Sequence, residues 1–303
     1  HSIRRRQRQM CIRDRMFIEQ GKRVSVLDLL KGIIIQSGND ATVALAEYVG
    51  GTEDGFVDLM NSYAASMGLS NTLFQNSTGL PDGNHFSSAK DLATMTSLLI
   101  ENFPETYSLY KEKYFEFNNI RQPNRNRLLW KDNSSDGVKT GHTESAGYCL
   151  ISSAQRNEMR LIAVVAGAES DKERFNDTQR LLEYGFRFYS TQEVIKKDNA
   201  LKDVTVWGGK EDLVSLGSEN NIKLTLPRTI FKNITITYDF QNNLRAPIKE
   251  GQVLGTLIIK DGEKALHKEN LVALNSVEAK GFFGRLWANF VLWIRSLFGL
   301  GNA

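Results

Sequence analysis

The feature that most constrains this chain is a change of hydrophobic period near Thr191. Before that point apolar residues recur at helical spacing, whereas after it short runs such as VTVWGG, IKLTLP and ITITYDF alternate between apolar and polar residues. Periods of 3.6 and 2 belong to helices and strands respectively, so one architecture does not serve both halves. The sequence therefore predicts an α+β domain followed by a small all-β sandwich over residues 193–277.

The first half alternates helical segments with strands. YFEFNNI alternates as a strand, with NRLLW as its expected neighbour across a turn, and the apolar runs of 148–167 predict a hairpin. Helices on both sides of an antiparallel sheet are typical of an α+β domain, which we expect over residues 16–192. The predicted helices cover residues 24–36, 40–48, 52–67, 88–102 and 171–189.

Composition excludes several function classes. A net charge of +3 without a basic stripe excludes nucleic acid as a partner. Two cysteines, Cys11 and Cys149, and four scattered histidines supply neither a disulfide framework nor a metal cluster, so we expect no metal and no cofactor. No run of 18 apolar residues is present, so nothing predicts a membrane-spanning helix.

The first fifteen residues, HSIRRRQRQMCIRDR, contain six arginines. A signal peptide would continue into an apolar core, and this segment does not. It is either a basic surface arm or, in the interpretation that we favour, non-native sequence that precedes an N-terminally truncated chain. On that interpretation native sequence begins near Met16.

Two tripeptides carry the chemistry. Ser37-Gly38-Asn39 lies between two helical patterns, and Lys139-Thr140-Gly141 leads into the apolar hairpin, 102 residues further on. Each alone is a weak signal, and the plain alternatives are a capped helix–loop–helix connection and a strand entered from a turn. Their order and contexts together match two elements of the S-x-x-K, serine-x-asparagine and K-T-G set of penicillin-binding proteins and β-lactamases.

Acyl transfer explains these residue types. A nucleophilic serine passes its proton to a lysine, and a second serine, here Ser37, can relay a proton to the leaving amine. Asn39 can orient that lysine and hold a substrate amide, while Lys139 supplies positive charge beside Ser37. At Gly141 a side chain would obstruct an extended peptide pairing with an edge strand.

From Met16 to its C-terminus the chain resembles the low-molecular-mass penicillin-binding proteins that are D-alanyl-D-alanine carboxypeptidases. The resemblance rests on QSGNDA, SSAKDLA, YKEKYFEFNNIRQPNRNRLLW, DGVKTGHTESAGYCLISSA and LLEYGFRFY. It implies a serine acyl-enzyme that removes the terminal D-alanine of peptidoglycan pentapeptides and is acylated by β-lactams. It also implies substrate-binding roles for His142, Arg125 and Arg174. A guanidinium can bind a terminal carboxylate bidentately, although each arginine could equally form a surface ion pair.

The first element of the family's site is missing. The family places S-x-x-K further upstream than the 36 residues that precede Ser37 allow. Two matches, Ser87-Ser88-Ala89-Lys90 and Ser108-Leu109-Tyr110-Lys111, follow Ser37 and are interpreted as chance patterns. We therefore expect an incomplete penicillin-binding domain, poor packing around Ile33–Ile35, and no turnover by the chain as printed.

The last segment, residues 278–303, predicts an amphipathic helix. Tryptophans beside a basic polar face favour a helix lying in a membrane interface, and the alternative is a helix docked on the β domain or in a dimer. The resemblance implies attachment to the outer leaflet of the bacterial inner membrane, and hence a periplasmic enzyme. The apolar side chains of the helix that we expect to contact the membrane are Phe282, Phe283, Leu286, Trp287, Phe290, Ile294, Leu297 and Phe298.

Two other functions compete with the carboxypeptidase. A β-lactamase shares the motifs but would need a deacylating carboxylate loop between Asn39 and Lys139, which is not evident. A non-catalytic peptidoglycan-binding scaffold would explain the missing nucleophile, although the retained tripeptides argue against decay.

Overall fold

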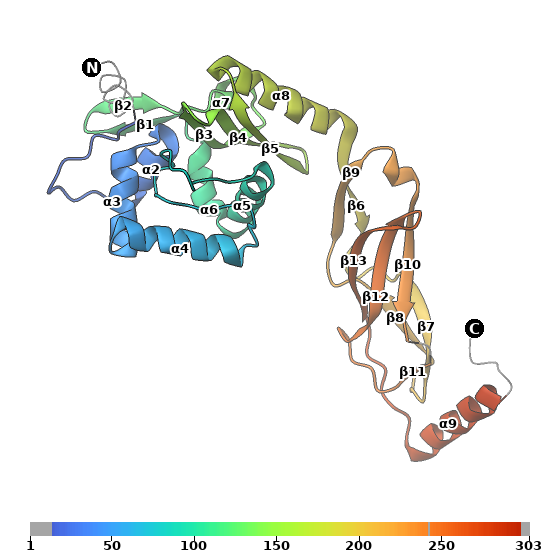
Figure 1. Cartoon of the computed structure of the whole chain (residues 1–303). Helices are drawn as coiled ribbons and strands as arrows, with labels where there is room; N and C mark the ends of the chain where they lie inside the picture. The colour runs from blue at the N-terminus through green and yellow to red at the C-terminus, as the bar shows by residue number, and fades with distance from the viewer. Residues whose placement is uncertain (1–13, 242, 298–303) are drawn as a thin grey trace. The chain divides into compact units, whose positions relative to one another are not determined.

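The computed structural model describes residues 14–241 and 243–297 (Figure 1). The chain divides between Arg187 and Phe188 into two compact units, the first mixed α and β and the second rich in β-strands. The predicted α+β class, followed by a β-rich part, is confirmed. The helices of the first unit are α2 (Val26–Gln36), α3 (Asn39–Gly50), α4 (Glu53–Ser66), α5 (Ala89–Asn102), α6 (Pro104–Tyr107), the 3₁₀ turn η1 (Ser108–Lys111), α7 (Leu128–Lys131) and α8 (Asp171–Phe188).

The sheet of the first unit is an antiparallel meander, β3-β4-β5. Strand β3 (Ser135–Thr143) pairs with β4 (Gly147–Arg156), which forms the predicted hairpin with β5 (Met159–Ala168). In the described part of the chain β3 has a partner on one side only, so Lys139, Thr140 and Gly141 lie on an edge strand.

The expectation that NRLLW forms a strand is wrong. The strand β1 (Tyr114–Phe117) pairs instead with β2 (Ile120–Pro123), immediately after the turn. Leu128–Lys131 forms the short helix α7, and Leu128 and Leu129 are buried. A single helical turn with two adjacent apolar residues has too short a period to be distinguished from a strand by pattern.

Packing around Ile33–Ile35 is better than expected. Ile35 has no exposed surface and Ile34 is 5% exposed. Met16 and Phe115, from outside α2, fill the space that we expected to be vacant. The expectation of poor packing in this part of the unit is therefore wrong.

Helix α8 buries a narrower stripe than its apolar residues suggest. Phe175, Leu182 and Phe186 are buried, whereas Leu181 and Tyr184 are about half exposed. The helix lies so close to β5 that a Cβ at Gly185 would come within 2.5 Å of a Leu161 methyl carbon. This close approach explains a glycine inside an 18-residue helix.

The second unit has two sheets around an aliphatic core. The larger sheet has the order β10-β12-β13-β8-β7-β11, and β6 pairs with β9 separately. Leu216, Leu257 and Ile259 in its core have no exposed surface. Its elements are β6 (Tyr189–Ile195), β7 (Lys202–Trp207), β8 (Leu213–Gly217), β9 (Ile222–Pro227), η2 (Ile230–Lys232), β10 (Ile234–Phe240), β11 (Leu244–Arg245), β12 (Val253–Asp261), β13 (Lys264–Ala273) and α9 (Phe282–Leu297).

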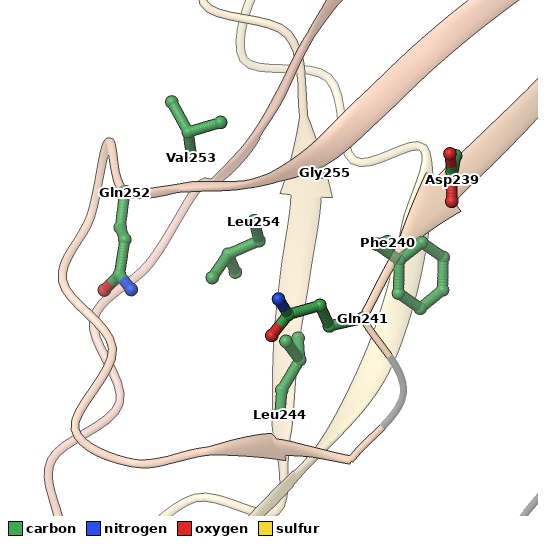
Figure 2. A pocket seen from close by; sticks show the side chains of 8 residues that line it. All are labelled: Asp239, Phe240, Gln241, Leu244, Gln252, Val253, Leu254 and Gly255. Carbon is green, nitrogen blue, oxygen red and sulfur yellow. The ribbon is translucent and has the colours of Figure 1, made fainter.

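A hollow of about 560 Å³ opens in the second unit, where β10, β11 and β12 end (Figure 2). Its polar lining consists of Asp239, Gln241 and Gln252, with Leu244 and Leu254 as apolar walls. None of the residues predicted to carry chemistry lines it, since all of them belong to the first unit.

Candidate active site

Ser37 ends helix α2 in the left-handed conformation, with φ 59° and ψ 41°. Its backbone N–H donates to Ile33 O at 3.0 Å, and Gly38 N–H donates to Gly32 O at 3.1 Å, which closes the helix terminus. A non-glycine residue in this conformation carries strain that the surroundings must hold in place. Helix α2 thus ends at Gln36 and α3 begins at Asn39, with Ser37 in the turn between them.

Asp40 holds this turn from the other side. Its carboxylate accepts hydrogen bonds from the backbone N–H groups of Met16 and Phe17 at 2.9 Å and of Ile18 at 3.2 Å. Gly38 has no room for a side chain, because a Cβ there would lie 3.1 Å from both the Asp40 carboxylate and Met16 N. The sequence shows that an acidic residue lies in the first turn of a predicted helix. It does not show that this residue binds amides more than twenty residues away.

The side chains of Lys139 and Ser37 are in direct contact. The Lys139 ammonium nitrogen donates to the Ser37 hydroxyl oxygen and, at 3.1 Å, to the carbonyl of Thr140. Burial lowers the pKa of Lys139 to about 7; the positive charges of Arg125 and Arg174 act in the same direction, against the opposing effect of Asp14. A lysine with this pKa exchanges a proton readily at neutral pH.

The other predicted site residues surround this pair to different degrees. Asn39 is half-buried at the start of α3, and its side chain has no hydrogen bond within the described ranges. Thr140 is buried, whereas Gly141 and His142 are exposed at the edge strand. The His142 ring lies against Tyr148, with ring centroids 4.0 Å apart.

Gly141 has no packing reason to be glycine. A Cβ there would meet only Cys149 Cβ, at 3.8 Å, and the backbone is not in the left-handed region. Gly137, four residues earlier on the same strand, does have a packing reason to be glycine, because a Cβ there would come within 2.6 Å of the Tyr107 hydroxyl. The absence of an internal cause at Gly141 fits a requirement from outside the chain.

The two candidate arginines lie in different environments. The side chain of Arg125 is 31% exposed and pairs with Asp14 at 2.5 Å. The side chain of Arg174 is 8% exposed and pairs with Asp171. Burial lowers the pKa of Arg174, and the Asp171 carboxylate opposes that effect.

Both chance matches to S-x-x-K have structural roles. Ser87 shares a hydrogen bond with the Thr72 hydroxyl, with the two oxygens 2.8 Å apart, and Lys90 is exposed. Ser108 donates to Glu105 O at 2.6 Å, and Lys111 is exposed. Neither serine approaches its lysine as a catalytic pair would.

Two residues near the site escaped sequence reasoning. Asn126 is 1% exposed; its side-chain amide donates to Gly137 O at 2.9 Å and accepts from Leu128 N–H at 3.1 Å. Tyr148 stacks on His142, and no sequence pattern indicated that contact. Within residues 14–241 and 243–297, no group of three His, Cys, Asp or Glu side chains is placed to hold a metal ion.

Known proteins resemble this chain over most of its length. Residues 4–170 match the D-alanyl-D-alanine carboxypeptidase family, and residues 189–279 match the C-terminal domain of penicillin-binding protein 5. The D-alanyl-D-alanine carboxypeptidase DacC of Escherichia coli is 46% identical over 286 residues, which cover 94% of this chain and 72% of that protein.

Solved structures agree. Penicillin-binding protein 5 from Haemophilus influenzae superposes with a TM-score of 0.79 at 39% identity, covering 89% of this chain and 80% of that one. Penicillin-binding protein D2 from Listeria monocytogenes, in its cefotaxime-bound form, covers 57% of this chain and 71% of that one, at 33% identity and a TM-score of 0.53. The chain therefore belongs to the family of serine-type D-alanyl-D-alanine carboxypeptidases.

Proposed function

We propose that Ser37, Asn39 and Lys139 are the second and third elements of a three-part acyl-transfer site. The observation that supports this most is the contact between the Lys139 ammonium and the Ser37 hydroxyl. With its pKa near 7, protonated Lys139 can donate a proton to the Ser37 hydroxyl oxygen while Ser37 passes its own proton to the departing D-alanine amine.

The proposed substrate is a peptidoglycan pentapeptide stem laid along the open edge of β3. Backbone groups of Thr140 and Gly141 would pair with the peptide, and the bare Gly141 leaves room for its approach. His142 borders the same edge, and Arg125 offers a partly exposed guanidinium for the terminal carboxylate. β-Lactams, which also carry a carboxylate beside an acyl centre, would use the same groups.

We propose that none of Ser37, Ser87 and Ser108 is the acylated nucleophile, because Ser37 contacts Lys139 as a relay would and the other two have hydrogen-bond partners of their own. The test is incubation with a fluorescent penicillin, followed by electrophoresis and peptide mapping. No label is expected on these three serines, and a label on any of them would contradict the proposal. Non-covalent binding of the pentapeptide without acylation would be the property of the scaffold alternative.

We also propose the division of labour along the chain. Residues 16–192 would form the catalytic domain and residues 193–277 the β-sandwich. Residues 278–303 would form the membrane-attaching tail, and residues 1–15 a non-native head. Residues 1–13 lie outside the described ranges.

The last helix supports attachment to a membrane surface. No helix in the described part of the chain is long and apolar enough to cross a membrane. On α9 the exposed fractions are 83% for Phe283, 68% for Trp287 and 59% for Trp293. From residue 279 onward the sequence has Lys280, Arg285 and Arg295 but no acidic residue. The side chains of Ile294 and Leu297, and all of Phe298, lie outside the described part.

Exposed aromatic side chains, in a tail whose charged residues are all basic in the sequence, fit the headgroup layer of an anionic bilayer. We propose that this helix attaches the protein to the inner membrane, on the periplasmic side that the family resemblance implies. Co-sedimentation with vesicles of phosphatidylethanolamine and phosphatidylglycerol should be lost in Trp287→Glu. Leu213→Glu, which changes an exposed leucine of β8, should sediment like the parent chain. Equal sedimentation of both variants would contradict the attachment.

A further inference from the structure

Arg174 is tied to the backbone of the candidate site rather than open to a ligand. Its Nη1 donates to Gly141 O at 2.9 Å and to Cys149 O at 3.4 Å, while Nη2 donates to Asp171. The side chain is 8% exposed, against 31% for Arg125. Both outer nitrogens of the guanidinium thus donate within the protein, to two strands and to a carboxylate of the same helix.

The two carbonyls lie where the sheet is irregular. Gly141 faces Cys149 across the β3–β4 pair. In the β4–β5 pair the register shifts between Tyr148 and Leu150, so Cys149 has no partner residue on β5. A bulge of this kind leaves backbone groups outside the ladder. The guanidinium fork of Arg174 supplies the donor that the neighbouring strand does not.

The same guanidinium supports the ring beside His142. Arg174 Cζ lies 5.4 Å from the centroid of the Tyr148 ring, and the Tyr148 and His142 ring centroids are 4.0 Å apart. Tyr148 therefore contacts Arg174 and His142 alike. Moving Arg174 would release both the Gly141 carbonyl and the ring on which His142 rests.

We infer that Arg174 is a positioning residue that fixes the Gly141–His142 edge of β3, and that Arg125 alone receives the carboxylate of the substrate. The inference rests on the proposed function, in which that edge holds an acyl-D-alanyl-D-alanine peptide. The family resemblance implied the same substrate-binding role for both arginines. The inference gives them different roles, positioning for Arg174 and carboxylate binding for Arg125.

Amide hydrogen exchange tests the positioning role without a ligand. Arg174→Gln should speed exchange at residues 140–142 and 147–150 by about tenfold or more, since the Gly141 and Cys149 carbonyls each lose a charged donor. Exchange in the middle of β5, at residues 161–164, should change by less than about twofold, because local opening is confined to the elements whose contacts are lost. Unchanged exchange at residues 140–142 would overturn the inference.

Arg180 provides a matched control. It lies on the same helix, pairs with the aspartate three residues before it, as Arg174 does, and is 81% exposed. Arg180→Gln should leave exchange at β3 unchanged. Arg174→Lys should protect β3 better than Arg174→Gln but less than the parent, because an ammonium keeps the charge without the planar fork.

A ligand cycle tests the division between the arginines. The probes are diacetyl-lysyl-D-alanyl-D-alanine and its C-terminal amide, with affinities measured by calorimetry for the parent and each variant. Arg174→Gln should weaken both probes by the same factor, so that the preference for the carboxylate is kept. Arg125→Gln should abolish that preference. Loss of the preference in Arg174→Gln would overturn the inference.

The two kinds of failure can be told apart. If the parent chain binds neither probe, the proposed substrate is wrong, and the exchange measurement still decides whether Arg174 positions the strand. If the parent binds and exchange at β3 is unaffected by Arg174→Gln, the proposed function stands and the positioning role is refuted.

Discussion

The two units bury different kinds of side chain. In the second unit Ser218 is the one polar side chain among the described buried residues, and the core is otherwise aliphatic. The first unit buries polar or charged side chains in many places. They are Gln36, Asp91, Thr96, Asn124, Asn126, Ser135, Thr140, Ser152, Ser153, Arg174 and Thr178.

The two kinds of core do different things: the aliphatic core mainly stabilises its unit, and the buried polar groups mainly fix the geometry of theirs. An aliphatic core is stabilised by removal of apolar surface from water, with little demand on direction. Buried polar groups contribute little net free energy but are costly when unpaired, so they restrict the backbone to arrangements that satisfy them. The unit that carries Lys139 and Ser37 is the one built in this way, since its chemistry depends on fixed positions.

The largest effect is expected in the second unit. Leu257, which has no exposed surface, is at the centre of β12. Leu257→Ala should lower the free energy of unfolding by about 2–5 kcal/mol, because it removes packed methyl groups and leaves a cavity. Chemical denaturation followed by tryptophan fluorescence measures this. Val253→Ala, at a half-exposed position of the same strand, is the control, and an equal loss in both would contradict the description of the core.

A smaller effect is expected from a buried amide in the first unit. Asn126→Ala leaves the Gly137 carbonyl and the Leu128 N–H without their side-chain partner. The expected loss is about 2 kcal/mol, mainly the cost of the unpaired Leu128 N–H, since the Gly137 carbonyl still accepts from the Ser152 hydroxyl. Asn102, an exposed residue that donates only to Leu98 O, supplies the control Asn102→Ala. A loss below that of the control would mean that the polar interior does not restrict this unit.

A still smaller effect is expected at Asp40. Asp40→Asn replaces a carboxylate oxygen that accepts backbone N–H groups with an amide that does not, and should cost about 1 kcal/mol. Hydrogen exchange at Phe17 and Ile18 should accelerate, because these amides lose their acceptor. Asp58→Asn, at an exposed position on α4, should leave it unchanged. If the amides of residues 17 and 18 exchange as slowly in Asp40→Asn as in the parent, the Asp40 carboxylate does not hold this segment.

The pH dependence of stability distinguishes the units further. The folded chain holds the pKa of Lys139 near 7, below its usual 10.5, so the unfolded chain binds more protons between these values. The contribution of Lys139 to the free energy of unfolding should therefore rise with pH from about 7 to 10.5. Lys139→Met should remove this rise for the first unit. A rise of the same size in the variant would assign the effect to other groups.

Sequence reasoning succeeded where the signal was local or periodic. The hairpin of β4 and β5 and the change to a β-rich second unit follow from neighbouring residues. The tripeptides at Ser37 and Lys139 were paired through recognised motifs, and the fold brings them into contact.

It failed where the cause lies in tertiary contacts. Leu128 forms a short helix because it packs into the core next to Asn126, not because of its own period. Asp40 binds amides more than twenty residues away, which no window reveals. The hydrogen bonds of Arg174 to the Gly141 and Cys149 carbonyls could not be predicted from the sequence either.

The central claim is that Lys139 and Ser37 form a proton-exchanging pair at neutral pH. The most direct measurement is a nuclear magnetic resonance titration of the lysine Cε and Nζ signals, with Lys139 assigned through Lys139→Arg. A pKa near 7 is predicted for Lys139, while exposed lysines such as Lys172 serve as the reference. A value near the usual 10.5 would contradict the claim, because Lys139 would then keep its proton at neutral pH.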